Sequence, residues 1–366
     1  MTTSYLHSSF IEDIQYNCNI SDARDHGNYS MCTMVLKLRN LYKWEHDLEP
    51  WQEPEPADLL DWIEAKETYW KTLAEEPFRH LGLNGRRYGP DDSADINAGL
   101  SGKKILYGAG LGRSMKAVFF LAEKLEERTI AGCPVFILGK ERAREMASPF
   151  AMAQDGVIFI RKESLRYFLW DQIQELRSSC RSSFRHAIGL YGLWQDGRLN
   201  QQKFRKTLDT IVDTELDLFI YHEVGEILQT TLDSSTLRII ISRFPGSVYE
   251  HVCRAIKDIL ADTHPEGLLA HLIREKREAS LSFYIGFLDG LRKVLFPEIF
   301  TAASRFFEDH DWQPIEQARR VCRANTLQYA GQIKSLSQHI GHVSDDHVRD
   351  LFNSQILVPL GLNIPQ

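Results

Sequence analysis

The sequence predicts a mainly helical protein that carries a small α/β insertion. Apolar residues recur at helical spacing through residues 31–74 and again over 165–353. Short runs rich in Ile, Val, Phe and Leu are concentrated between residues 103 and 161. Glycines lie at the ends of these runs, as they commonly do at the ends of strands. The chain has 366 residues, of which 43% are hydrophobic, so it is long enough to bury a large core.

The N-terminal third is expected to be helical after an irregular start. Residues 1–30 show no clear period and are predicted to be a lead-in. A helix over 31–49 follows, and it ends before Pro50 because the residue preceding a proline avoids the helical conformation. A second helix opens at 57–58, and together the two helices form a helical part that we place at 31–100.

Residues 101–170 form the predicted α/β insertion. Strands are expected at 103–107, 134–138 and 157–161, with helical stretches at 114–130 and 141–147 between them. An alternation of strand and helix predicts a short, parallel, three-stranded sheet with right-handed crossovers.

The remaining residues, 171–366, are predicted to form a helical domain that packs with the N-terminal helices as a bundle. The expected helices of the C-terminal half are 165–180, 200–230, 246–262, 266–296, 298–309, 313–337 and 344–353. No period of 20–50 residues repeats, which argues against a solenoid.

Composition narrows the classes of function. The net charge is −7 and no basic stripe is present, which argues against binding to nucleic acid or to an anionic membrane. No apolar stretch is long enough to span a bilayer, and the N-terminus lacks the pattern of a signal peptide. The six cysteines are far apart and form no CxxC pair, which favours reduced thiols in a cytoplasmic protein.

Ionisable side chains interrupt the apolar stripe of the helix predicted at 200–230. Glu215, His222 and Glu226 fall within about 40° of one line along its axis, among leucine, isoleucine and phenylalanine side chains. Burying carboxylates and an imidazole costs free energy unless they are paired, hydrogen-bonded or bound to metal. This helix therefore carries either a functional site or a buried polar network.

Two other helices share this pattern: Glu45 and Glu49 continue the apolar stripe of the first helix, and Glu67 lies in that of the second. Inward carboxylates and histidines from bundled helices build dinuclear iron and manganese sites, but this chain has no Glu-x-x-His pair. A single metal site or an acid/base pair fits better, with His222 and Glu226 as the catalytic candidates. The candidate ligands of a divalent metal (iron, manganese or zinc) are Glu45, Glu49, Glu67, Glu215, His222 and Glu226.

A structural explanation stays open for these residues, namely a polar network completed by arginines such as Arg39, Arg254 or Arg292. The helix at 246–262 serves as a comparison, because its polar residues fall off the apolar face. There the i,i+4 pattern predicts a solvated ion pair. The residues of this pattern are His251, Arg254, Asp258 and Asp262.

A glycine-rich turn is predicted between the first strand and the helix at 114–130. Glycines allow backbone N–H groups to approach an anion, and a helix N-terminus favours negative charge. The spacing matches neither the dinucleotide-binding G-x-G-x-x-G pattern nor a Walker A loop. A phosphate- or nucleotide-binding turn and a tight turn capped by serine both remain possible. The residues concerned are Gly108, Gly110, Gly112, Arg113 and Ser114.

Three segments resemble an uncharacterised proteobacterial family of about this length: LRNLYKWEHDLEPW (38–51), YGAGLGRS (107–114) and YHEVGE (221–226). The resemblance covers nearly the whole chain and implies a bacterial, cytoplasmic protein with one integrated architecture, but no assigned activity. Three hypotheses therefore stand. They are a metal-dependent or acid/base enzyme with a small-molecule ligand, a phosphate- or nucleotide-binding module, and a non-catalytic scaffold.

Overall fold

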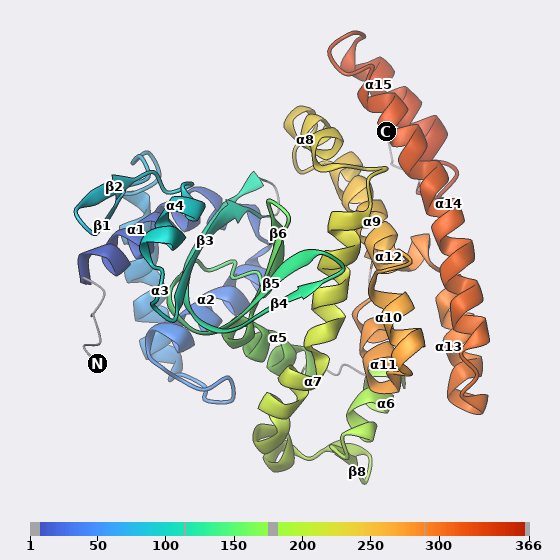
Figure 1. Cartoon of the computed structure of the whole chain (residues 1–366), viewed down its shortest axis with the longest axis horizontal. Coiled ribbons are helices and arrows are strands. Elements are labelled where there is room, and N and C mark those ends of the chain that lie inside the picture. The colour runs from blue at the N-terminus through green and yellow to red at the C-terminus, as the bar shows by residue number, and fades with distance from the viewer. Residues whose placement is uncertain (1–7, 113–114, 175–181, 289, 363–366) are drawn as a thin grey trace. The chain divides into compact units, whose positions relative to one another are not determined.

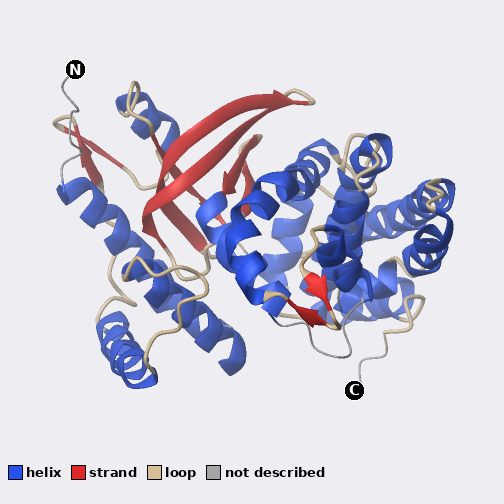
Figure 2. Ribbon diagram, turned by 90° about the horizontal axis from the view of Figure 1, so that it is seen from below, coloured by secondary structure: helices blue, strands red, loops and turns tan. Residues whose placement is uncertain are grey.

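The computed structural model describes residues 8–112, 115–174, 182–288 and 290–362. The chain divides into two compact units, the first made of 1–175 with 207–212 and the second of 176–206 with 213–366. Helices account for most of the described residues and a mixed sheet lies in the first unit (Figures 1 and 2). The mainly helical fold class is thus confirmed.

The elements of the first unit are α1 (Ser8–Asp25), the 3-10 turn η1 (His26–Asn28), α2 (Met31–Glu45), α3 (Pro56–Lys71), β1 (Leu81–Leu83), β2 (Arg86–Tyr88), α4 (Ser93–Gly99), β3 (Ile105–Leu111), β4 (Ala117–Ile130), β5 (Cys133–Arg144), β6 (Ala151–Gln154), β7 (Val157–Arg161) and α5 (Lys162–Gln174).

The second unit contains α6 (Ser182–Leu190), β8 (Trp194–Gln195), β9 (Arg198–Leu199), most of α7 (Gln201–Leu228), α8 (Ser234–Arg243), α9 (Val248–Asp262), α10 (Leu268–Glu275), α11 (Glu278–Phe287), α12 (Gly290–Leu295), α13 (Glu298–Asp309), α14 (Gln313–Ser337), α15 (Asp345–Phe352) and the π-helical turn η3 (Asn353–Leu357).

The main sheet differs from the predicted one. It has five strands in the order β3-β4-β5-β7-β6, and only β5 and β7 are parallel. The register of β4 against β5 shifts near Ala122 and Lys124, and such bulges bend long strands, as Figure 2 shows for this sheet. The three predicted strands correspond to β3, β5 and β7, and β5 and β7 are parallel as predicted. The prediction is wrong in strand number and in the direction of the other pairs, because β4 and β6 also belong to the sheet and pair antiparallel.

The helix expected at 114–130 is instead strand β4. Phe119 and Leu121 enter one core beneath α1, whereas Val118 and Phe120 enter a second core on the other face of the sheet. A strand buried on both faces shows a continuous apolar run instead of an alternation, so its period does not separate it from a helix.

The lead-in predicted at 1–30 is largely the helix α1. Its inner face carries polar residues: Asn17 exchanges hydrogen bonds of 2.9 and 2.7 Å with the backbone of Arg79, and Asp22 accepts one of 2.7 Å from Lys116. Because these buried residues are polar, α1 lacks a continuous apolar stripe, and its helical period is not visible in the sequence.

The helices of the second unit follow the prediction more closely. Helices α13 and α14 have the expected bounds, and α7 differs by two residues at most at either end. The helix expected at 266–296 is three helices, because the backbone turns left-handed at Lys276 (φ 55°) and Gly290 (φ 45°).

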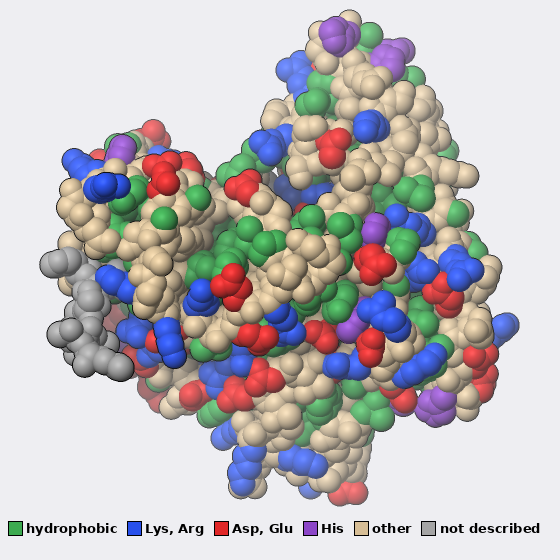
Figure 3. All heavy atoms as spheres, in the orientation of Figure 1, with side chains coloured by type: hydrophobic (Ala, Val, Ile, Leu, Met, Phe, Trp, Pro, Cys, Tyr) green, Lys and Arg blue, Asp and Glu red, His purple; other side chains and the backbone are tan. Residues whose placement is uncertain are grey.

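All five cysteines in the described residues are free thiols; Cys180 lies outside these residues. Cys18, Cys133, Cys253 and Cys322 are buried, and Cys32 is exposed. No helix in the described part of the chain combines the length and the apolar character needed to cross a membrane. On the face drawn in Figure 3, acidic and basic side chains are interspersed.

Candidate metal centre

The candidate site lies where α7 and α9 approach closely. A Cβ built on Gly225 would meet the carbonyl oxygen of Ala261 at 2.1 Å, so only glycine permits this contact between the two helices. Glu226 is the next residue on α7 and Asp262 the next on α9. The backbone contact therefore brings the polar side chains of the two helices into reach of one another.

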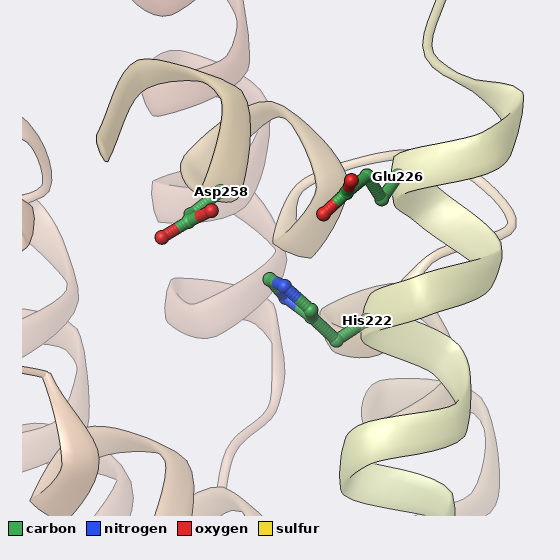
Figure 4. A group of neighbouring side chains, drawn as sticks. All are labelled: His222, Glu226 and Asp258. Carbon is green, nitrogen blue, oxygen red and sulfur yellow. The ribbon is translucent and has the colours of Figure 1, made fainter. Parts of the chain in front are cut away.

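His222 and Glu226 stand one turn apart on α7, and Asp258 and Asp262 one turn apart on α9. Figure 4 shows His222 and Glu226 extending toward the helix that carries Asp258. One ligand atom from each of His222, Glu226 and Asp258 lies within 4.8 Å of the other two, and all three side chains are partly buried.

Both α7 side chains are oriented by a further ionic partner. His222 Nδ1 donates to Asp262 Oδ1 at 2.7 Å, and the Asp262 side chain is only 2% exposed. Lys257 Nζ donates to Glu226 Oε1 at 2.6 Å. Because Asp262 fixes Nδ1 as the hydrogen-bond donor, Nε2 is the imidazole nitrogen that remains for a further ligand.

The carboxylates around His222 control its protonation. Burial lowers the pKa of His222, but the negative charge and hydrogen bond of Asp262, helped by Glu223, outweigh burial and raise this pKa to about 10. Burial also raises the pKa of Asp258. The pKa of Glu226 is lowered, because Lys257 and His222 overcome the effect of burial.

Glu215 is the third polar residue of α7, and it lies apart from this cluster. Seven residues separate it from His222, about 10 Å along the axis, which is too far for one metal ion. Its side chain is fully buried and accepts a hydrogen bond from the hydroxyl of Tyr191. Burial raises the pKa of Glu215, against the hydrogen bonds of Ser280 and Tyr191.

The three remaining candidate ligands belong to the first unit, where two of them form ion pairs. Glu45 pairs with Lys66 and accepts a hydrogen bond of 2.9 Å from Trp62 Nε1. Glu49, whose side chain is 44% exposed, pairs with Arg166 at 2.7 Å. Glu67 is partly exposed on α3. Among the described residues, none of these three belongs to a group of potential metal ligands.

Asp258 and Asp262 were not among the predicted ligands. Their off-face position on α9 predicted a solvated ion pair, and for Asp262 this is wrong because the residue is 1% exposed. The sequence did contain a signal for these residues, because α7 and α9 each carry ionisable side chains four positions apart.

Of the arginines expected in a network, Arg39 pairs with Asp171, which leaves it outside the cluster, and Arg254 pairs with Glu250. The charge of Arg254 nevertheless helps to lower the pKa of Glu226, and that of Arg292 opposes the rise in the pKa of Asp258.

In the described residues, the element that follows the glycine-rich segment along the chain is strand β4, not a helix. Gly108 and Gly110 lie within β3, and Gly112 follows it; Arg113 and Ser114 lie outside the described residues. A Cβ on Gly108 would meet the ring of Phe120 at 2.0 Å, so this glycine makes room for an aromatic side chain. The helix whose N-terminus was expected to favour an anion is not there, because β4 takes its place.

The site and fold thus describe a mainly helical protein whose described residues contain one group of three potential metal ligands, in the second unit. Residues 9–161 match the N-terminal domain, and residues 166–355 the C-terminal domain, of a family of unknown function, DUF6866. The chain belongs to this family. No curated protein and no solved structure is detectably similar to it.

Proposed function

We propose that the second unit binds one divalent transition metal through His222 Nε2 and one carboxylate oxygen each from Glu226 and Asp258. The observation that carries this proposal is that one ligand atom from each of these three residues lies within 4.8 Å of the other two, while Asp262 holds Nδ1 of the imidazole. A histidine that donates its other N–H to a buried carboxylate is the usual arrangement around protein-bound metals.

The geometry needs little adjustment to hold an ion. Ligands about 2.1 Å from a metal are separated from one another by about 3 to 4 Å, so the side chains need to close by about 1 Å. One nitrogen and two oxygens suit zinc, iron or manganese. Three protein ligands leave positions open for water or a small-molecule substrate, which supports Lewis-acid chemistry in a metal-dependent enzyme.

Without metal, a His222 pKa of about 10 keeps the imidazole protonated at neutral pH, where it cannot act as a general base. Metal binding would displace the Nε2 proton and supply the positive charge that the surrounding carboxylates favour. The buried free thiols agree with a reducing, cytoplasmic setting.

Metal binding is tested by calorimetry on the full chain after chelator treatment, with Zn²⁺, Mn²⁺ and Fe²⁺ as probes. We expect one ion per chain for the natural sequence and at least a tenfold loss of affinity in His222→Asn, Glu226→Gln and Asp258→Asn. His186→Asn is the matched control, because His186 pairs with Glu278 at 2.7 Å outside the cluster. Equal binding by all variants would assign the metal elsewhere, and absence of binding would leave an ionic network.

A further inference from the structure

A pocket of about 410 Å³ opens in the first unit, far along the sequence from the α7–α9 cluster. Its walls come from α2, from the end of β5 with the loop that follows, and from α5. Leu36, Pro149 and Phe168 supply apolar surface, and Arg144 and Lys37 supply positive charge. The volume is that of a site for a small organic molecule.

Arg144 is buried in the pocket wall without a full set of acceptors. Its side chain is 3% exposed, yet neither Nε nor Nη1 makes a hydrogen bond. The nearest carboxylate, Glu141, lies 3.5 Å from Nε and is already bound by Arg161 through two contacts of 3.0 Å. Since a buried guanidinium without acceptors is costly, Arg144 is ready to receive an additional anion.

Aromatic rings hold this guanidinium in place. The charged carbon of Arg144 lies 5.6 Å from the ring centre of Trp44 and 5.7 Å from that of Tyr167. Such contacts favour an orientation of the planar group between the two rings. A pre-oriented fork of N–H donors matches the two oxygens of a carboxylate.

Lys37 adds a second cation to the same wall. Its ammonium donates one hydrogen bond, of 2.9 Å, to the carbonyl of Ala147, and it makes no ion pair among the described residues. Burial, together with the positive charges of Lys116 and Arg144, lowers the pKa of Lys37 to about 8. An anion in the pocket would relieve this repulsion.

The charged side chains around the pocket include one more cation than carboxylate, which favours the binding of one anion. Asp22 pairs with Lys116, and Arg161 binds Glu141 and Glu145, so these three carboxylates face four cations when Arg144 and Lys37 are included. The pocket also contains Asp171, which is neutralised by Arg39 at 2.7 Å and held by Asn40. Glu163 accepts a hydrogen bond from the backbone of Glu141, and burial raises its pKa.

We propose that this pocket binds a small organic monocarboxylate, with its oxygens on the Arg144 guanidinium and Lys37 Nζ and its hydrocarbon part against Leu36, Pro149 and Phe168. The apolar walls favour an organic acid over inorganic phosphate. The proposal concerns the first unit only and is independent of metal binding in the second.

The test is calorimetry and thermal unfolding of the full chain with benzoate and hexanoate, with benzamide as the neutral analogue and inorganic phosphate as the second anion. A saturable rise in melting temperature is expected with the carboxylates and not with benzamide. Arg144→Met should weaken carboxylate binding at least tenfold. Arg142→Met is the matched control, since Arg142 lies on the same strand, is 46% exposed and pairs with Glu123.

Lys37→Met is the second variant and should also weaken binding, so the test does not depend on the folding of one mutant. Unchanged carboxylate affinity in both variants would overturn the proposal. So would equal binding of benzamide, a response to phosphate alone, or the absence of any carboxylate effect at about 20 mM, a concentration at which even weak sites are occupied.

Discussion

Gly225 and Ala261 are in contact through their backbones: a Cβ on Gly225 would lie 2.1 Å from the carbonyl oxygen of Ala261. This contact sets the separation of α7 and α9 one residue away from Glu226 on one helix and Asp262 on the other. The candidate metal centre therefore depends on a glycine that bears no functional group.

Gly225→Ala should destabilise the protein by about 1–3 kcal/mol or more, because the new methyl group collides with backbone that cannot rotate away. Gly331→Ala is the control, since Gly331 also lies in a helix but has nothing within 4 Å of an added Cβ. That change should raise stability by about 0.5–1 kcal/mol. Urea unfolding of both variants measures the difference, and similar effects at the two positions would contradict the close contact.

Asp262→Asn should lower metal affinity by about 10–100-fold, although Asp262 is not a proposed ligand. The change removes the charge that favours and orients His222 while keeping an oxygen that can accept from Nδ1. Competition titrations with a chromogenic chelator measure the affinity. Glu278→Gln, at the partner of His186, should have no effect; a loss of the same size there would indicate a general effect on folding.

The pH dependence of stability should report the His222–Asp262 pair in chelator-treated protein. The folded pKa of His222, about 10, lies above its ordinary value, so its contribution is fully present below about pH 6.5 and is lost as pH rises through about 10. His222→Asn retains a neutral donor toward Asp262. We expect the natural chain to exceed this variant by a few kcal/mol near pH 6 and by much less near pH 10. A difference independent of pH would show that the imidazolium does not stabilise the fold.

Arg161→Met should destabilise the first unit by about 3–5 kcal/mol. Arg161 is fully buried and binds Glu141 and Glu145, so its removal takes the ion pair from Glu145 and leaves Glu141 only the more distant one with Arg144. The double variant with Glu141→Gln should recover part of the loss, because one of the stranded charges is then neutral. Unfolding followed by circular dichroism measures both; a loss below about 1 kcal/mol would indicate that water reaches the site.

The sequence predicted the fold best where one helix face is apolar and the other polar. α13 and α14 satisfy that condition, and their bounds were predicted correctly. The prediction failed at β4, whose apolar residues serve two cores, and at α1, whose buried face carries Asn17 and Asp22. In β4 and in α1, the apolar positions do not follow the period of a strand or of a helix, so hydrophobic periodicity alone could not identify either element.

The candidate site was predicted in part for a related reason. His222 and Glu226 stood out because they share a line with apolar residues on one helix, and the structure groups them with Asp258. Asp258 lies off the apolar face of α9, and its role depends on how closely Gly225 lets the two helices approach. The distance between α7 and α9 cannot be read from a single sequence, so Asp258 could not be identified as the residue that joins His222 and Glu226.

The distribution of thiols offers a reporter for the first unit. Cys32, the exposed cysteine, stands at the start of α2 beside Thr33, a residue of the pocket wall, whereas the other described cysteines are shielded from solvent. Thiol-directed dyes react with accessible cysteines, so after Cys180→Ser a maleimide fluorophore should attach at one place. The protein thereby carries its own labelling position, from which ligand entry can be followed by fluorescence without introducing a new cysteine.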